Sequence, residues 1–206
     1  MKSYPSIAGS RDHKVALGTP CLGFYKYDGS NLRWEWSKKQ GWCKFGTRHR
    51  LFGHDEEPYN QAIPIFLNEL APSIEDIVRH EFKGLQKFIA FTEFFGPSSF
   101  AGNHELTEPK ELVLIDVNIH PKGIIVPRLF LDLFGDQPYA PLLIYEGNLN
   151  QKLIEDVRSG IYPVEEGIVC KGADRRNTPW MVKIKTNAYL DKLKNRFGDD
   201  WVKYAE

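Results

Sequence analysis

The sequence predicts an α+β fold in which largely antiparallel sheets are flanked by helices. Short β-rich runs and amphipathic helical segments follow one another irregularly, without the regular alternation that is typical of a parallel doubly wound sheet. No segment repeats at a fixed period, and no low-complexity linker divides the 206 residues. We therefore expect a single domain over residues 1–206.

Periodicity and turn residues predict the individual elements in order along the chain. Residues 22–50 alternate and are rich in aromatics, and the turn signals Asp28-Gly29 and Gln40-Gly41 indicate strands joined by tight connections. A helix over about 73–83 is predicted to begin at Ser73, an N-cap residue followed by acidic residues. Further strands are expected at Lys87–Phe95, Glu111–Ile119, 141–145, 167–171 and 180–185. Further helices are expected over 126–134, 150–158 and 187–204.

The charge balance excludes two classes of protein and hides an uneven distribution. The 27 Lys+Arg equal the 27 Asp+Glu, which excludes a uniformly basic nucleic-acid coat protein and an acidic disordered tail. Residues 33–50, however, contain 6 basic residues against 1 acid, and residues 171–196 contain 8 against 2. Residues 55–81 contain 7 acids against 1 Arg. If the two basic segments converge in the fold, the surface is polarised and its neutrality is only a sum; binding of phosphate would then be local and salt-sensitive.

Other features of the composition point to a soluble protein. No apolar run approaches the roughly 20 residues that cross a bilayer, and the N-terminus lacks the apolar core of a signal peptide. We expect a cytoplasmic monomer that does not associate with a membrane. The three cysteines form no CxxC pair, which argues against a disulfide scaffold and a structural metal.

The hexapeptide at residues 26–31, Lys-Tyr-Asp-Gly-Ser-Asn, is the most informative motif. By itself, its Lys-x-Asp-Gly portion is also compatible with a hairpin turn beside a solvated lysine. Other charged residues lie inside otherwise apolar strands, namely Glu93, Asp116, Glu166, Lys171, Lys183 and Lys185. Charges in such places cost free energy to desolvate unless they pair or face a wet cleft. They predict one polar site lined from several strands.

With these blocks in this order, the sequence resembles the covalent nucleotidyltransferase superfamily of ATP-dependent DNA and RNA ligases and mRNA capping enzymes. Five blocks match in the order of the family between Lys26 and Lys185 and cover most of the chain. DNA ligases and capping enzymes usually have Arg at the fifth position after the lysine. RNA ligases related to the editing ligases and to the type-2 phage enzyme have Asn, which is Asn31 here. The resemblance implies an adenylylation domain and favours an ATP-dependent RNA ligase.

The resemblance also implies a nucleophile and a set of phosphate contacts. Lys26 would attack the α-phosphorus of ATP, release pyrophosphate and hold AMP as a phosphoramidate. A lysine of ordinary pKa is neutral in only roughly 1 molecule in 2,500 at pH 7, so nearby positive charge is needed to favour the neutral amine. The expected cations are Lys171, Lys183 and Lys185, which would also contact phosphate, together with a bound metal ion.

The resemblance assigns the acidic residues to the nucleotide and the metal. Glu93 and Asp116 are expected in the nucleoside pocket, with Glu93 reaching the ribose hydroxyls. Glu166 is expected to orient a hydrated Mg²⁺ or Mn²⁺ near the α-phosphate, since such a cation needs only one or two carboxylates. Asp28 shares a strand face with the nucleophile and is expected to pair with the ammonium or with a metal-bound water. The alternative for these carboxylates is a set of structural ion pairs with the lysines.

Three further positions are assigned to the turn and to nucleic acid. Gly29 would permit positive φ and a close approach of the chain to the nucleotide. Asn31 matches a position linked to nick sealing. Arg48 matches an arginine that contacts a nucleic-acid 5′-phosphate, for which planar guanidinium geometry is suited; Arg50 is the alternative for this role. The expected partner is RNA, as a nicked duplex or as strand ends, and DNA is the second choice.

Several departures from the family pattern affect these expectations. Phe24 and Tyr25 stand where relatives carry a glutamate that reads adenine, so base recognition is expected to rest on backbone groups or on another residue. Only 21 residues follow Lys185, so we expect a minimal ligase without an OB-fold or helical C-terminal domain. The alternatives to an RNA ligase are an ATP-dependent DNA ligase, a capping-type guanylyltransferase, and an inactive module that binds nucleotide or RNA.

Overall fold

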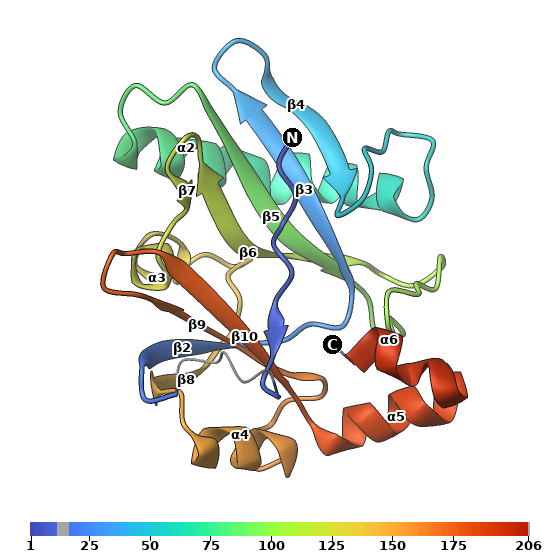
Figure 1. The fold of residues 1–206 in the computed structure, drawn as a ribbon. Coiled ribbons are helices and arrows are strands. Elements are labelled where there is room, and N and C mark those ends of the chain that lie inside the picture. Colours follow the sequence, from blue (N-terminus) through green and yellow to red (C-terminus); the bar gives the residue numbers. More distant parts are fainter. Residues whose placement is uncertain (12–16, 206) are drawn as a thin grey trace. The chain divides into compact units, whose positions relative to one another are not determined.

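The structure, a computed structural model, describes residues 1–11 and 17–205 and divides into two compact units (Figure 1). The first unit comprises Met1–Pro5, Asp28–Ile125 and Leu129–Pro141, and the second comprises Ser6–Tyr27, Val126–Arg128 and Leu142–Glu206. The strands are β1 Ala8–Gly9, β2 Pro20–Tyr25, β3 Ser30–Ser37, β4 Gly41–Thr47, β5 Lys87–Phe95, β6 Glu111–Ile119, β7 Gly123–Ile124, β8 Leu143–Asn148, β9 Gly167–Ala173 and β10 Pro179–Lys185. The helices are η1 Tyr59–Gln61, α1 Ala62–Ile65, η2 Phe66–Leu70, α2 Ala71–Glu81, α3 Pro127–Phe134, α4 Gln151–Arg158, α5 Asn187–Phe197, η3 Gly198–Trp201 and α6 Val202–Ala205. The predicted α+β class with antiparallel sheets is confirmed.

The first unit is built on a five-stranded antiparallel sheet of order β4-β3-β5-β6-β7. Side chains of a strand alternate between the two faces of its sheet. One face of β3 is apolar, and on it the fully buried Trp34 stacks on Phe66 of η2, with ring centroids 4.0 Å apart. The opposite face of β3 presents Asn31, Arg33 and Glu35. Packing of the helices on one face therefore leaves the other face polar.

The helical layer of this unit starts earlier than the sequence pattern predicts. The expected helix over 73–83 is confirmed as α2, but its predicted start at Ser73 is wrong. The chain is already helical from Ala62 and passes through the π-helical η2 before α2 begins at Ala71. The buried residues Phe66 and Leu70 explain this early start, because the helix must extend back to bury them. Ser73 lies in the first turn of α2 and contacts the hydroxyl of Tyr139.

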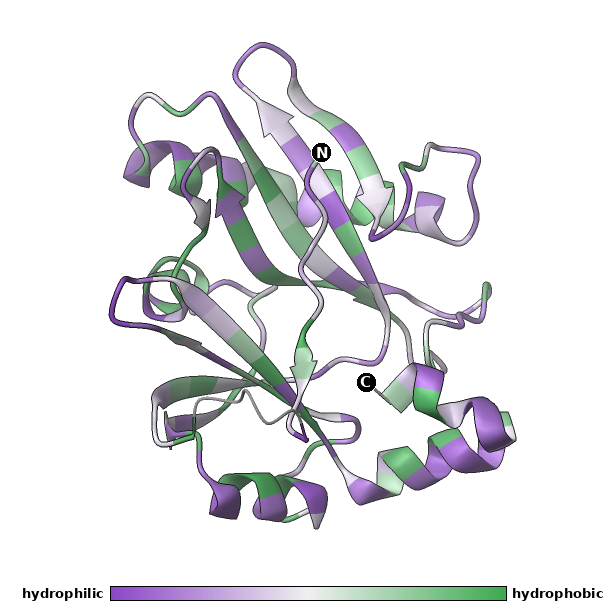
Figure 2. Ribbon diagram, viewed as in Figure 1, coloured by the Kyte–Doolittle hydropathy of each residue, from purple (hydrophilic) through white to green (hydrophobic). Residues whose placement is uncertain are grey.

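The second unit contains a sheet of order β1-β10-β9-β2-β8. Strand β1 pairs parallel with β10, and the remaining pairs are antiparallel. Helix α4 is capped by Asn150, whose Oδ1 accepts a 2.8 Å hydrogen bond from the amide of Leu153. Its buried residues form an apolar cluster with β9 and β10, namely Leu153, Ile154, Val157, Ile168, Cys170, Val182 and Ile184. Figure 2 shows hydrophobic residues on β9 and β10 and the hydrophilic turn that joins these two strands.

Two predicted connections differ from the observed ones. The single helix expected over 187–204 is wrong, because α5 ends at Gly198, where φ is 54°, and the chain turns back through η3 and α6. This reversal stacks Phe197 on Tyr204, with ring centroids 4.0 Å apart. The Asp28-Gly29 sequence does not close a hairpin either, because β2 and β3 belong to different sheets.

The remaining strand and helix predictions hold closely. The strands at Lys87–Phe95 and Glu111–Ile119 have the predicted bounds, and the Gln40-Gly41 turn joins β3 to β4 with φ of 65° at Gly41. The strand expected at 141–145 begins two residues later, as β8. No helix in the described part of the chain combines the length and the apolar character that crossing a membrane requires.

Candidate active site

Three predicted residues meet in the second unit around one buried carboxylate. The Oε1 atom of Glu166 lies 2.9 Å from Nζ of Lys26 and 3.0 Å from Nζ of Lys185. The exposed fraction of the side chain is 20% for Lys26, 8% for Lys185 and 3% for Glu166. Two cations therefore share one carboxylate oxygen, and Lys26 is the more accessible of them.

Backbone hydrogen bonds of the sheet position these groups. The amide of Lys26 donates to the carbonyl of Gly167 at 3.0 Å, which extends the pairing of β2 with β9 by one residue. The amide of Thr186 donates to the carbonyl of Glu166 at 2.9 Å and holds the end of β10 beside the start of β9. Gly167 permits this approach, because a Cβ atom there would lie 1.9 Å from the carbonyl oxygen of Ile184.

The C-terminal segment also holds Lys185. Its Nζ donates a 2.7 Å hydrogen bond to the carbonyl of Tyr204 and lies 4.9 Å from the centroid of the Tyr189 ring. Tyr189 is part of α5, whose N-cap is Thr186, the residue directly after Lys185. The reversal at Gly198 thus places the last turn of the chain on a residue of the site. Nothing in the sequence pattern pointed to this contact.

The other two predicted lysines are Lys183 on β10 and Lys171 on β9, and Lys171 is the more deeply buried of the two. Lys183 precedes Lys185 by two residues on β10 and therefore shares its face of the sheet. Lys171 lies in β9 opposite Met181, is buried, and has its Nζ 5.3 Å from the centroid of the Phe24 ring. Lys183 is half-buried between Gly9 of β1 and Val169 of β9, whereas Lys171 lies over the ring of Phe24.

Glu166 has the chemistry of a metal-binding carboxylate. Its Oε2 atom is buried and has no hydrogen-bond partner among the described residues. Burying an anionic oxygen without a partner costs free energy unless a cation or a water molecule binds it. In the described part of the chain no three His, Cys, Asp or Glu residues gather as a metal-binding group. The residues present therefore fit a hydrated Mg²⁺ or Mn²⁺ that takes one protein oxygen and keeps most of its water.

The predicted nucleoside residues lie on the polar face of the sheet in the first unit. In the register of the strands, Asn31 of β3 is opposite Glu93 of β5, and Phe91 of β5 is opposite Asp116 of β6. Asp116 is buried and Glu93 is half-buried. These residues form two adjacent cross-strand rows, so the structure brings Glu93 and Asp116 onto one face.

Tyr4 is part of this face and was missed by the sequence reasoning. Its hydroxyl donates to a carboxylate oxygen of Asp116, and its ring centroid lies 5.0 Å from that of Phe91. Burial, and then the negative charge of Asp116, raise the pKa of Tyr4 well above its usual value. The N-terminal segment is held nearby by Arg33, which donates to the carbonyl of Met1 at 2.9 Å. The N-terminal residues follow no periodic pattern that predicts this placement.

The two residues assigned to nucleic acid lie in the first unit as well. The Nδ2 atom of Asn31 donates weakly to the carbonyl of Thr92 at 3.4 Å, and its buried Oδ1 has no partner among the described residues. Arg48 is half-buried, and its positive charge acts to lower the pKa of Tyr4, against the larger effect of burial. Arg50 is exposed and pairs with Glu56 at 2.6 Å. This contrast favours Arg48 over Arg50 as the residue that belongs to the polar face.

The side chain of Asp28 contacts a loop of the first unit. Its Oδ1 accepts a 2.8 Å hydrogen bond from the amide of Ala101, in the loop that joins β5 to β6. Gly29 was expected to permit positive φ but does not adopt it. Its missing side chain serves a different purpose, because a Cβ atom would lie 2.3 Å from the carbonyl oxygen of Phe94. Asp28 and Gly29 thus hold the motif against β5 and its following loop.

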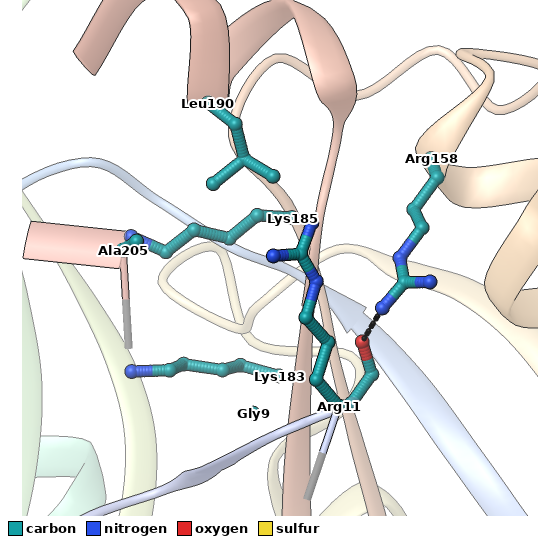
Figure 3. A pocket seen from close by; sticks show the side chains of 8 residues that line it. Gly9, Arg11, Arg158, Lys183, Lys185, Leu190 and Ala205 are labelled. Carbon is teal, nitrogen blue, oxygen red and sulfur yellow. Dashed lines mark hydrogen bonds between the residues drawn. The ribbon is translucent and has the colours of Figure 1, made fainter. Parts of the chain in front are cut away.

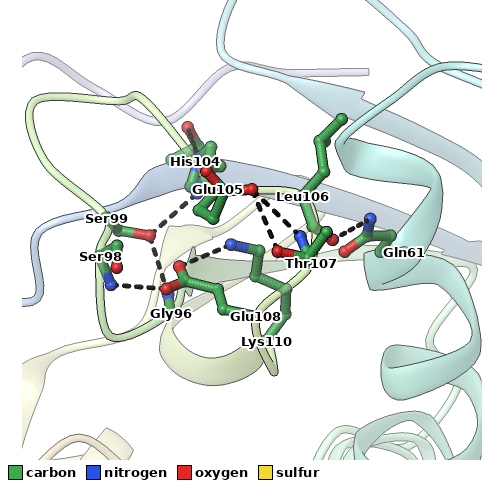
Figure 4. Close-up of polar contacts among 11 residues, drawn as sticks. Gln61, Gly96, Ser98, Ser99, His104, Glu105, Leu106, Thr107, Glu108 and Lys110 are labelled. Carbon is green, nitrogen blue, oxygen red and sulfur yellow. Dashed lines mark hydrogen bonds and ion pairs between the residues drawn. The ribbon is translucent and has the colours of Figure 1, made fainter.

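A histidine in this loop completes the contact with the motif. His104 binds the hydroxyl of Ser30 at 2.8 Å through Nε2 and that of Ser99 at 3.0 Å through Nδ1. Burial lowers its pKa to about 4. Figure 4 shows the loop's own contacts, which include a 2.7 Å ion pair between Lys110 and Glu108. The loop is therefore an ordered, internally bonded support for the Lys-x-Asp-Gly motif.

Comparisons with known proteins identify the fold. No family model matches the sequence, and no curated protein matches it either. Among solved structures, a Naegleria gruberi RNA ligase variant with AMP and Mn superposes with a TM-score of 0.64 at 17% identity, over 93% of this chain and 58% of that one. The same ligase with PPi gives 0.61 at 18% identity, over 95% and 61%.

An archaeal ATP-dependent RNA ligase gives a TM-score of 0.63 at 15% identity, over 96% of this chain and 52% of that one. The chain thus spans about half to three fifths of the length of these structures. The resemblance read from the sequence is confirmed at the level of the fold: the chain folds as ATP-dependent RNA ligases do.

Proposed function

We propose that the protein is an ATP-dependent RNA ligase that forms a lysyl-AMP intermediate at Lys26. The observation that carries this proposal is the group of Lys26, Glu166 and Lys185, in which an accessible lysine lies 2.9 Å from a buried carboxylate that a second lysine also contacts. The solved relatives in fold include RNA ligases with AMP and Mn and with ATP and Mn. That similarity supports ATP as the substrate and a divalent cation as the cofactor.

The first step begins when the ammonium of Lys26 gives up a proton. Glu166 lies within hydrogen-bond distance to accept it, and the positive charge of Lys185 disfavours a second ammonium nearby. The nitrogen lone pair then forms a bond to the α-phosphorus of ATP. The bond from that phosphorus to its bridging oxygen breaks, and the electron pair leaves on pyrophosphate. Lys183 and Lys185 would offset the negative charge that develops on the leaving group.

The divalent cation fits at Oε2 of Glu166, as Mg²⁺ or Mn²⁺. When bound, it would offset negative charge on the α-phosphate. The role of the protein at this point is to hold the carboxylate rigidly, which it does through the backbone contact between Glu166 and Thr186. Glu93 and Asp116 would hold the nucleoside, with Glu93 reaching the ribose hydroxyls.

In the following steps AMP passes from Lys26 to the 5′-phosphate of an RNA end, and a 3′-hydroxyl then displaces AMP to seal the strand. Arg48 is suited to the 5′-phosphate because a guanidinium binds phosphate through paired hydrogen bonds. The buried Oδ1 of Asn31 has an unused acceptor lone pair, which suits a hydroxyl donor. The similarity in fold to RNA ligases supports RNA as the proposed substrate, and a DNA ligase or a guanylyltransferase is the competing proposal.

The experiment is covalent labelling with nucleotide labelled at the α-phosphate. The full chain is incubated with Mg²⁺ or Mn²⁺ and labelled ATP or GTP, and is then separated on a denaturing gel. We expect label from ATP, none with Lys26→Ala, and none with Lys26→Arg, which keeps the positive charge beside Glu166 but not the nucleophile. The exposed Lys152→Ala serves as the matched control and is expected to label normally.

Each other outcome has a defined meaning. Label from GTP alone would assign the chain to capping chemistry, and no label from either nucleotide would leave an inactive nucleotide-binding module. Undiminished label in Lys26→Ala would place the nucleophile elsewhere. Nicked duplexes with RNA or DNA at the 3′-hydroxyl end then decide between the two ligase proposals.

A further inference from the structure

A strongly basic pocket lies in the second unit beside the candidate active site. It is open to solvent and is lined by Gly9, Ser10, Arg11, Arg158, Lys183, Lys185, Leu190 and Ala205. Figure 3 shows that its cationic side chains come from the N-terminal segment, from α4 and from β10. Four of these eight residues are cationic and none is acidic. Four cationic residues around one small pocket favour an anion as its ligand.

The pocket has a preorganised wall. The amide of Ser10 donates to the carbonyl of Lys183 at 3.0 Å, which fixes Ser10 beside β10. The hydroxyl of Ser10 accepts a 3.0 Å hydrogen bond from Nη2 of Arg158, and this contact orients the guanidinium from the end of α4. An oriented guanidinium binds phosphate oxygens at a smaller entropic cost than a free one. The wall is therefore built before any ligand arrives.

Lys185 links this pocket to the nucleophile. The same ammonium lines the pocket and lies 3.0 Å from the oxygen of Glu166 that Lys26 contacts. Lys26 itself is not part of the pocket lining. The pocket and the nucleophile therefore share one neighbouring residue, Lys185.

The charge of the pocket indicates which anion fits. A single phosphodiester carries one negative charge, whereas a terminal phosphate monoester carries about −1.5 to −2 at pH 7. Two linked phosphoryl groups therefore match four cations better than one phosphodiester does.

We propose that this pocket binds the diphosphate end of ATP, and pyrophosphate once it has left, with Arg11 and Arg158 as its specific positioning residues. This inference rests on the proposed function, since it assigns the pocket to the leaving group of that reaction. Neither arginine belongs to the motifs of the sequence. Arg11 and Arg158 act on the leaving group and Lys26 on the α-phosphorus, so their contributions are separable.

The direct test is calorimetric titration of the full chain with inorganic pyrophosphate, with orthophosphate as the comparison. We expect Arg158→Gln to weaken pyrophosphate binding about tenfold or more and Arg11→Gln to weaken it by about threefold to tenfold, as for loss of a charge-assisted hydrogen bond. Arg158→Lys is expected to lie in between. Lys152→Gln, an exposed lysine on the same helix, is the matched control and is expected to stay within about twofold of the wild type. Equal pyrophosphate affinity in Arg158→Gln and the wild type, with unchanged urea unfolding, would overturn the proposal.

A second measurement separates the source of the phosphate. Sealing of an RNA whose 5′-phosphate already carries AMP releases no pyrophosphate, so Arg158→Gln is expected to seal it at the wild-type rate while its labelling from ATP slows about tenfold. Slower sealing with unchanged pyrophosphate binding would assign the pocket to the RNA and overturn the proposal. If the wild type labels with no nucleotide, the proposed function fails, and the calorimetric test still reports on the pocket.

Discussion

The amide of Ala101 donates a 2.8 Å hydrogen bond to the Oδ1 of Asp28, and so ties the loop after β5 to the Lys-x-Asp-Gly motif. Asp28→Ala would leave this amide without its acceptor. We expect a loss of about 1–2 kcal/mol in the free energy of unfolding, measured by urea denaturation, and slower labelling of Lys26. Asp28→Asn keeps an acceptor at the same place and is expected to retain most of the stability. Asp55→Ala, at an exposed acid of the same unit, is the control; equal stability of the two alanine variants would contradict a tethering role.

Glu166 neutralises two lysines with one oxygen, so its replacement affects both stability and reaction. We expect Glu166→Gln to lower the free energy of unfolding by about 2 kcal/mol, since Lys26 and Lys185 lose their shared anion. Labelling is expected to slow at least about tenfold and to need a higher Mg²⁺ or Mn²⁺ concentration. The measurement is a metal titration of the labelling rate. The exposed neighbour Glu165→Gln is the control, and an unchanged metal dependence in Glu166→Gln would exclude a metal role.

Tyr4 donates to Asp116 from the N-terminal segment. Tyr4→Phe keeps the ring against Phe91 and removes the donor, and we expect it to cost about 1–2 kcal/mol of stability. The raised pKa of Tyr4 has a further consequence. The contribution of the Tyr4 hydroxyl to the free energy of unfolding is complete at pH values below its pKa in the unfolded chain, which is near 10. This contribution declines as the pH rises toward the higher pKa of the folded state. Unfolding of wild type and Tyr4→Phe between pH 8 and 11 checks this. Tyr204→Phe is the control, and parallel profiles for all three proteins would contradict it.

His104 makes the fold sensitive to acid. Burial lowers its pKa to about 4, so between about pH 6.5 and 4 the unfolded chain binds a proton that the folded chain does not. The contribution of the neutral ring is complete above pH 6.5 and is lost as the pH falls through this window. We expect the stability difference between pH 7 and pH 4.5 to be smaller in His104→Gln by on the order of 2 kcal/mol. His80→Gln, at an exposed histidine, is the control. If both variants lost the same stability between pH 7 and pH 4.5, His104 would not be the source of the acid sensitivity.

The order of the motifs and most of the secondary structure followed from the sequence alone, because alternation and helical spacing are local properties of the chain. Strands β5 and β6 have the predicted bounds, and Glu93 and Asp116 lie on them as expected. The predictions of the start of α2 and of a single C-terminal helix were wrong for the same reason. Phe66 is buried by tertiary packing, which extends the helix beyond the start that the local pattern predicts. At Gly198, likewise, the packing of the following segment ends α5 although the local pattern predicts a longer helix.

The tertiary structure decided which of the predicted residues are partners. Lys26 and Glu166 are 140 positions apart in the chain, and only the pairing of β2 with β9 places them 2.9 Å from each other. Tyr4, Arg11 and Arg158 carry no recognisable pattern, because their roles depend on chain segments that pack beside them without any periodicity of their own. The sequence by itself determined the fold class and the residue types that the chemistry needs. Their distances, burial and shared oxygen come from strand register and packing, which long-range contacts set.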